Sequence, residues 1–254
     1  MALVTTPAVI LHVMPYGDTS KILRLLTRDL GLRSAIARGA RRAKASTGPR
    51  LDLFALGEAS LRVHEARDLH PLTAFEITDA HAALAHGVTR FAAACAVAEL
   101  ALKAAPAEPH AGVFAAVAGA LAALAAAPEE GVDATALAAG WAVVVALGFS
   151  PSLDRCVVCG VPVEGAVHFS ASAGGALCGA HRAGGGGITR LAPPDRDALA
   201  ALVGGLLPDP PLDGRHAASH RRLLLSFIRY HLAEDRPLPA MAFWDEVGWT
   251  ATSS

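Results

Sequence analysis

The chain has 254 residues, of which 53% are hydrophobic and 18% charged. This composition excludes a long disordered protein, and the length allows two or three modest domains. The longest apolar run, residues 112–127, is mostly alanine and ends at Pro128, so it falls short of the roughly 20 strongly apolar residues of a membrane-spanning helix. No basic segment precedes the first apolar run, as it would in a secretory signal. We therefore expect a cytoplasmic protein with no membrane partner.

The net charge of −1 conceals a strong asymmetry along the chain. Residues 1–50 contain nine Lys and Arg and only two Asp, a net charge of +7, so the remainder carries −8. A concentrated positive end on a nearly neutral protein predicts an anionic partner for that end.

Residues 1–80 are predicted to be mostly β. Turn signals separate short β-rich runs, which lie at residues 8–13, 21–27, 32–38, 53–63 and 73–78. Residues 39–49 are polar and basic without apolar periodicity, and are expected to form a loop. Five short strands with one long basic loop fit a small barrel, and they also fit a small sandwich.

The remaining chain is predicted to be largely helical. Helix-forming segments occupy residues 89–104, 110–127, 135–147, 195–207 and 216–233, with a turn expected at 131–134. In the last of these helices, apolar side chains share one face, as expected for packing on a core. The final segment, residues 237–249, is apolar and aromatic and is expected to pack back on the helices.

Three of the four cysteines lie close together, in the spacing C-x2-C-x18-C-x2-H formed by Cys156, Cys159, Cys178 and His181. Two pairs of soft ligands in tight turns are typical of tetrahedral Zn²⁺. Residues 161–176 between the pairs could form a hairpin. The competing interpretations are three free thiols, or His168 as the fourth ligand. A closed four-ligand site would be structural rather than catalytic.

Two other features bear on function. Residues 38–48 combine arginines, a lysine and glycines, a pattern that can follow a phosphate backbone but is also typical of a solvated loop. The zone has few aromatic side chains for base stacking: Tyr16, Phe54 and Phe75, the last two expected in the core. His216 and His220, four residues apart on a predicted helix, could bind a metal ion, but no glutamate of a metalloprotease motif lies between them. A zinc hydrolase and an RNA-binding or scaffold module with a structural zinc site therefore remain as alternatives.

With these residues in view, nearly the whole chain resembles the bacterial RecO family of recombination-repair mediators. The resemblance is strongest in residues 17–23 (GDTSKIL), 26–31 (LTRDLG), 37–42 (ARGARR) and 51–54 (LDLF), and continues through 68–73 (DLHPLT) and 148–160 (GFSPSLDRCVVCG). His181 departs from the pattern, because many members of the family with a complete metal site use a fourth cysteine.

The resemblance implies an α+β fold: an OB-fold barrel at residues 1–80 and a helical domain at 81–254, interrupted by a zinc-finger-like module at about 154–190. It implies a non-enzymatic protein that binds single- and double-stranded DNA, anneals complementary strands and, with RecR, helps load RecA onto DNA coated by the single-strand-binding protein SSB. The acidic C-terminal tail of SSB would bind the helical domain, with Arg222 and Arg229 as candidate contacts. Such a protein would act in the cytoplasm, at the nucleoid. Six cations are expected to neutralise phosphates: Lys21, Arg24, Arg38, Arg41, Arg42 and Lys44.

Overall fold

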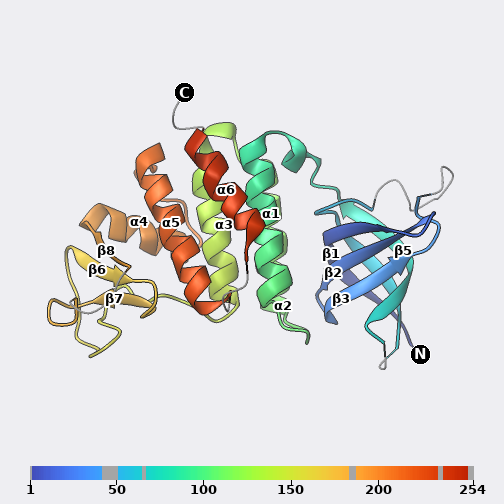
Figure 1. The fold of residues 1–254 in the computed structure, drawn as a ribbon, viewed down its shortest axis with the longest axis horizontal. Coiled ribbons are helices and arrows are strands. Elements are labelled where there is room, and N and C mark those ends of the chain that lie inside the picture. The colour runs from blue at the N-terminus through green and yellow to red at the C-terminus, as the bar shows by residue number, and fades with distance from the viewer. Residues whose placement is uncertain (1, 42–50, 65–66, 183–186, 234–236, 251–254) are drawn as a thin grey trace.

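The structure, a computed structural model, describes residues 2–41, 51–64, 67–182, 187–233 and 237–250. Figure 1 shows three parts in a row: a β-barrel, a central group of helices, and a small β-containing module at the far end from the barrel. Among the described residues, no helix is long and apolar enough to cross a membrane.

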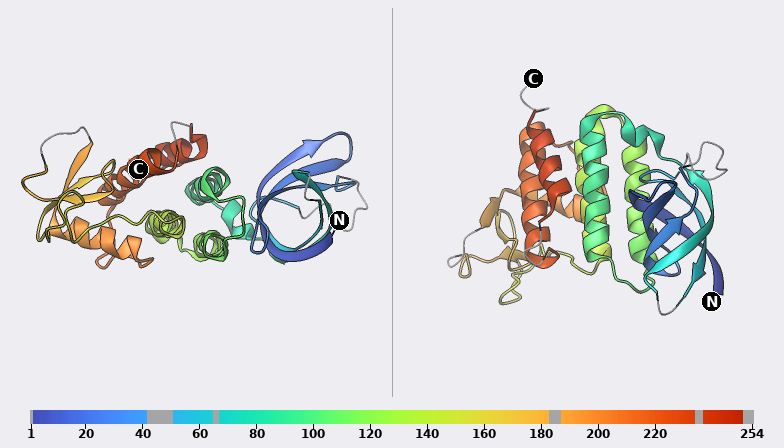
Figure 2. Two further views of the ribbon diagram at one scale, coloured as in Figure 1. Left: turned by 90° about the horizontal axis from the view of Figure 1, so that it is seen from below. Right: turned by 45° about the vertical axis from the view of Figure 1, so that its right-hand side comes forward.

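Five strands form the barrel: β1 (Ala2–Tyr16), β2 (Ser20–Thr27), β3 (Gly31–Ala37), β4 (Leu56–Val63) and β5 (Leu69–Asp79). They close in the order β1-β2-β3-β5-β4, with β4 pairing back on β1; the end-on view in Figure 2 shows this closure. All pairs are antiparallel except β3 with β5. The barrel, and not the sandwich, is thus the arrangement of the five strands.

Alternating apolar side chains fill the barrel, among them Ile10, Leu23, Leu25 and Leu61. The fourth strand begins at Leu56 and not at residue 53 as predicted, because Phe54 has a φ of +70° and interrupts the extended chain. Phe54 and Phe75 are both buried, as expected.

The helices of the described chain are α1 (Val88–Ala104), α2 (Ala111–Ala126), α3 (Val132–Ala146), α4 (Pro193–Val203), α5 (Gly214–His231) and α6 (Pro239–Thr250), with 3-10 turns at Ala82–Ala85 and Glu129–Gly131. Two predicted bounds were wrong. The turn before α3 was predicted at 131–134. A 3-10 turn that follows Pro128 replaces it, and α3 therefore already begins at Val132. Helix α4 stops at Val203 and not at residue 207, because Gly204 and the left-handed Gly205 follow.

The helical core is built from small and large side chains in close contact. Trp141 of α3 and Phe227 of α5 are buried with their rings 5.2 Å apart, edge to face. At Gly140 an added Cβ would lie 2.6 Å from Leu224 Cδ2, so glycine lets α3 and α5 approach closely. The aromatic tail packs on the helices as expected: it forms α6, in which Met241 and Trp244 are buried.

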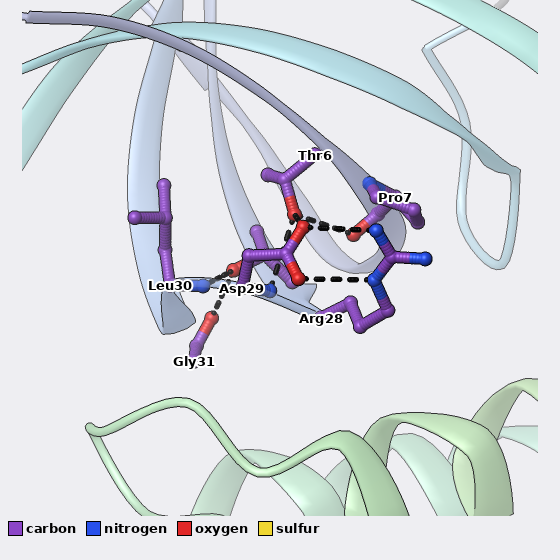
Figure 3. A network of polar contacts seen from close by, with 7 residues as sticks. Thr6, Pro7, Arg28, Asp29, Leu30 and Gly31 are labelled. Carbon is purple, nitrogen blue, oxygen red and sulfur yellow. Dashed lines mark hydrogen bonds and ion pairs between the residues drawn. The ribbon is translucent and has the colours of Figure 1, made fainter.

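A polar network fixes the turn between β2 and β3, where the barrel meets the helices (Figure 3). The Asp29 carboxylate accepts hydrogen bonds from Thr6 Oγ1 at 2.8 Å and Arg28 Nε at 3.0 Å. Thr27 Oγ1 donates to the Gly31 carbonyl at 2.7 Å. Arg28, which contributes to the positive N-terminal sequence, therefore forms an ion pair with its neighbour Asp29 at the surface of the protein.

The distal module contains a small sheet, β6 (Val167–Ser170), β7 (Gly175–Leu177) and β8 (Ile188–Leu191), in the order β7-β6-β8. The predicted hairpin exists as β6 and β7, slightly later in the chain than residues 161–176. The sheet places Cys178 and His181, just after the end of β7, next to the cysteines at 156 and 159.

Candidate metal centre and nucleic-acid interface

Two backbone turns present the four predicted metal ligands. In the first, Gly160 N–H donates to the Cys156 carbonyl at 2.8 Å, and Gly160 adopts a φ of +73° that favours glycine. In the second, His181 N–H donates to the Cys178 carbonyl at 3.0 Å. Because Val157 N–H also donates to the Ala176 carbonyl at 2.9 Å, the two turns face each other.

The ligand atoms of Cys156, Cys159, Cys178 and His181 all lie within 4.8 Å of one another. Cys159 Sγ and Cys178 Sγ are 3.8 Å apart, and His181 Nδ1 lies 3.3 Å from Cys178 Sγ and 3.6 Å from Cys156 Sγ. A tetrahedral zinc site has S–S edges of about 3.8 Å and S–N edges of about 3.6 Å, given its bond lengths. The four residues therefore fit a metal ion of this size. His168 lies on β6 and does not belong to the cluster.

At Cys156 and Cys178 the surroundings favour the thiolate, the form that binds metals. At Cys159 the Val161 N–H lowers the pKa, but burial and the side chains of Cys156 and Cys178 raise it overall. Burial raises the pKa of Cys156, but the backbone N–H groups of Cys178, Cys159 and Val158 outweigh it and lower the pKa to about 5. At Cys178 burial also raises the pKa, yet N–H groups of Ala180 and His181 lower it overall. Hydrogen bonding to Cys156 and then to Cys178 raises the pKa of His181. Within the described residues, no other group of three or more His, Cys, Asp or Glu side chains is so closely gathered.

The second candidate site is an open depression of about 870 Å³ on the barrel. Arg38 and Gly39, just after β3, line it together with Tyr16 and Thr19 of the β1–β2 turn. Arg67, from the segment before β5, also lines it. Arg38 is exposed, and the ring of Tyr16 is 54% exposed. The depression thus combines two guanidinium groups and the carboxylate of Asp68 with an accessible aromatic ring.

The other predicted phosphate contacts occupy different surroundings. Arg41 is exposed and donates to the Gly17 carbonyl at 3.2 Å, beside the depression. Lys21, only 18% exposed, donates to the Leu51 carbonyl at 3.1 Å and lies 3.5 Å from the Asp52 carboxylate. Its charge is therefore engaged within the protein. Arg42 and Lys44 lie outside the described residues.

Arg24 sits on the outer face of β2, between His12 of β1 and Ser34 of β3. It is half-buried, and its Nε atom is buried without a hydrogen-bond partner. The sequence alone did not single out Arg67, because a lone arginine between two strands carries no local signal. Only the return of β5 beside β3 brings it to the other basic side chains.

Comparison with known proteins covers nearly the whole chain. The family model described as Recombination protein O N terminal matches residues 1–81, and that described as Recombination protein O C terminal matches residues 86–239. The chain is similar to the DNA repair protein RecO of Anaeromyxobacter dehalogenans strain 2CP-C, with 36% identity over 248 residues, 94% of this chain and 95% of that protein. It is also similar to the DNA repair protein RecO of Nocardioides sp. strain JS614, with 31% identity over 246 residues, 93% of this chain and 96% of that protein. The chain therefore belongs to the RecO family of DNA repair proteins.

Proposed function

We propose that this protein binds single-stranded DNA on the outer face of its barrel and acts, without catalysis, as a mediator of recombination repair. The observation that carries the proposal is the depression in which Tyr16, Arg38 and Arg67 converge. In an OB-fold, the face of the second and third strands and the loops between strands 1–2 and 4–5 bind oligonucleotides. Tyr16, Arg38 and Arg67 lie in the corresponding places, which supports assigning the barrel, about residues 1–80, to that fold.

The proposed contacts with DNA are of two kinds, ion pairs with phosphates and stacking on a base. Arg38, Arg41 and Arg67 bind phosphates, and the exposed ring of Tyr16 stacks on a base. Arg24 borders the same face, and Arg42 and Lys44 extend the basic segment. We assign Lys21 a different role from the one the sequence predicts: its contacts with Leu51 and Asp52 hold the chain at the end of the basic segment.

This division also supports strand annealing. Guanidinium groups that neutralise phosphates reduce the repulsion between two strands, and they leave base edges free to pair because they do not read them. We propose that the protein binds double-stranded DNA, the product of annealing, through the same phosphate contacts. With RecR, it would help load RecA onto DNA coated by SSB, in the cytoplasm at the nucleoid.

We assign the Cys3His cluster to structural Zn²⁺. Cys156, Cys159, Cys178 and His181 would hold the ion with no open position, and zinc would supply folding energy and no reaction chemistry. The zinc module would then cover about residues 154–190, inserted in a helical domain that spans 81–254.

A second surface supports the proposed contact with the acidic C-terminal tail of SSB. A hollow of about 390 Å³ between α5 and α6 is lined by Leu225, Leu238 and Met241, with Arg229 among the lining residues. An apolar hollow with a cationic edge suits a tail that is both acidic and apolar. Arg222 lines a different hollow, beside Phe169 and Ser219, so the pair expected from the sequence is not one rim.

Oligonucleotide binding at several salt concentrations tests the proposal. In fluorescence anisotropy, the double variant R38E/R67E should bind single strands at least about tenfold more weakly. The slope of log K against log salt should fall by about 0.7 for each phosphate that the variant no longer neutralises. The matched control is R190E on β8, an equal change per residue at the far end of the molecule (Figure 1). Unchanged affinity and slope in R38E/R67E would refute the interface.

Annealing separates a mediator from a passive binder. Complementary oligonucleotides coated with SSB should anneal faster with the wild-type protein and not with R38E/R67E. Equal affinity for RNA and DNA with no annealing would instead favour the RNA-binding alternative.

A further inference from the structure

A second group of side chains of the kinds that bind metals lies on α4 and α5, after the cysteine cluster in the chain. His216 and His220 are one turn apart on α5, and Asp195 comes from the first turn of α4. Asp195 Oδ1 lies 3.8 Å from His216 Nε2 and 3.9 Å from His220 Nε2. One carboxylate oxygen therefore faces both imidazoles at distances too long for hydrogen bonds.

The imidazole of His220 is the unusual member of the group. The residue is only 2% exposed, and neither ring nitrogen has a hydrogen-bond partner among the residues that the structure describes. Buried polar atoms in proteins nearly always have partners, because leaving one unpaired costs about 1–3 kcal/mol. The unpaired ring beside Asp195 is thus available to bind a ligand.

Asp213 fixes the orientation of the His216 ring by hydrogen bonds, as carboxylates next to metal-ligating histidines commonly do. Its Oδ1 atom accepts the His216 backbone N–H and the ring Nδ1, both at 2.8 Å. Because a carboxylate oxygen is an acceptor, Nδ1 carries the hydrogen, and the lone pair of a neutral ring is then on Nε2, the atom that faces Asp195. Asp195, Asp213 and His216 also line a cavity of about 640 Å³, through which an ion and water can enter.

We propose that Asp195, His216 and His220 bind a divalent transition-metal ion, at a site separate from the Cys3His cluster. Two imidazoles and one carboxylate suit Zn²⁺, Co²⁺ or Ni²⁺ better than Mg²⁺ or Ca²⁺. Ligand atoms around a tetrahedral ion of this kind are about 3.3 Å apart, so each distance from Asp195 Oδ1 to an imidazole must shorten by about 0.5 Å. The two imidazoles must also move together, because the three ligand atoms are less closely gathered than those of the Cys3His cluster. The half-exposed ring of His216 has the freedom to do so.

The site would fasten α4 to α5, next to the strand β8 that leads out of the distal module. Residues 217–219 between the two histidines are Ala, Ala and Ser. The segment therefore lacks the glutamate of the metalloprotease motif.

Cobalt titration of the full chain, after its zinc has been removed with a chelator, tests the site. Thiolate-to-cobalt charge-transfer absorption reports the Cys3His cluster, whereas an imidazole and carboxylate site lacks that absorption. The wild-type protein should bind two Co²⁺ per chain, with only one showing the thiolate absorption. D195N and H216Q, both at partly exposed positions, should each bind only the thiolate-bound ion, or bind the second at least tenfold more weakly. They should also lose the increase in melting temperature that Ni²⁺ gives the zinc-loaded wild type.

H86Q, which changes an exposed histidine near α1, is the control for adventitious binding and should retain both ions. Circular dichroism identifies any variant that has not folded; D195N and H216Q spare the buried His220 for that reason. One Co²⁺ per chain in the wild type would overturn the proposal. So would a second ion that is retained in both D195N and H216Q, or lost equally in H86Q.

Discussion

Arg33 Nη1 donates a hydrogen bond of 2.8 Å to the carbonyl oxygen of Ala107, and so joins strand β3 of the barrel to the loop between α1 and α2. The same nitrogen donates to the Leu32 carbonyl at 2.9 Å. Two residues earlier, Gly31 brings its backbone against this loop. The barrel and the helices are therefore held together at a point where backbone atoms leave no space for a side chain.

The first prediction concerns this junction. In G31A, the new Cβ would lie 2.4 Å from the Ala107 carbonyl oxygen, at a residue whose φ is +73°. We expect a loss of about 2–3 kcal/mol in the free energy of unfolding, measured by urea denaturation. G17A is the matched control: its φ is also positive, at +54°, but no atom lies within 4 Å of the added Cβ. It should cost only about 1 kcal/mol. Equal losses in both variants would show that crowding at Ala107 contributes nothing.

The second prediction concerns the cysteine cluster. C178A removes a thiolate ligand, so the purified protein should contain no zinc at this cluster, and its melting temperature should fall by about 6–12 °C, as expected for a loss of about 3 kcal/mol. C95A is the control, because Cys95 packs against the helical core far from the cluster in sequence. It should retain full metal content. Metal analysis together with a chelator titration makes the measurement, and retention of zinc by C178A at the cluster would contradict the assignment.

The third prediction isolates stacking from charge. Y16A should lose about 1–3 kcal/mol in binding to single-stranded DNA, the usual contribution of one stacked base. Y16F should bind as well as the wild type, because stacking needs the ring and not the hydroxyl. Y230A is the control at the chain's other tyrosine, which is 59% exposed on α5. Anisotropy at fixed salt provides the affinities. A Y16F defect as large as that of Y16A would point to a hydrogen bond in place of stacking.

The fourth prediction concerns pH. His70 of β5 is buried, and burial, followed by the nearby charge of Arg33, lowers its pKa. The unfolded chain, with a histidine pKa of about 6.5, then binds more protons than the folded chain at mildly acidic pH. The contribution of His70 to stability is therefore present above about pH 6.5 and is lost as the pH falls toward the folded pKa.

H70L should reduce the difference in unfolding free energy between pH 7.5 and pH 5.5, measured with urea at both pH values. H86Q, an exposed histidine, should leave that difference unchanged. The comparison uses the difference between two pH values, so any direct effect of leucine on packing cancels. An unaltered pH dependence in H70L would exclude His70 as a contributor.

Local patterns in the sequence determined the strands, the helices and the cysteine cluster. Alternating apolar residues predict strands because the side-chain period of a strand is two, and C-x2-C and C-x2-H turns aim their ligands at one point wherever they occur. The bounds that were wrong at Phe54, Val132 and Val203 lie at turns, whereas β1 and β5 extend beyond the predicted residues 8–13 and 73–78 to Ala2–Tyr16 and Leu69–Asp79. At those turns a single left-handed residue or an earlier 3-10 turn overrides the hydrophobic pattern.

Only the tertiary structure determines which charged side chains are free to bind a ligand. The sequence places Lys21 and Arg38 in one basic segment, but the fold pairs Lys21 with Asp52 and leaves Arg38 exposed. It also brings Arg67 to Arg38, and Asp195 to His216 and His220, across long separations in the chain. The physical reason is that a charge interacts with whatever lies within a few ångströms of it, and those neighbours are set by how strands and helices pack and not by their order in the sequence.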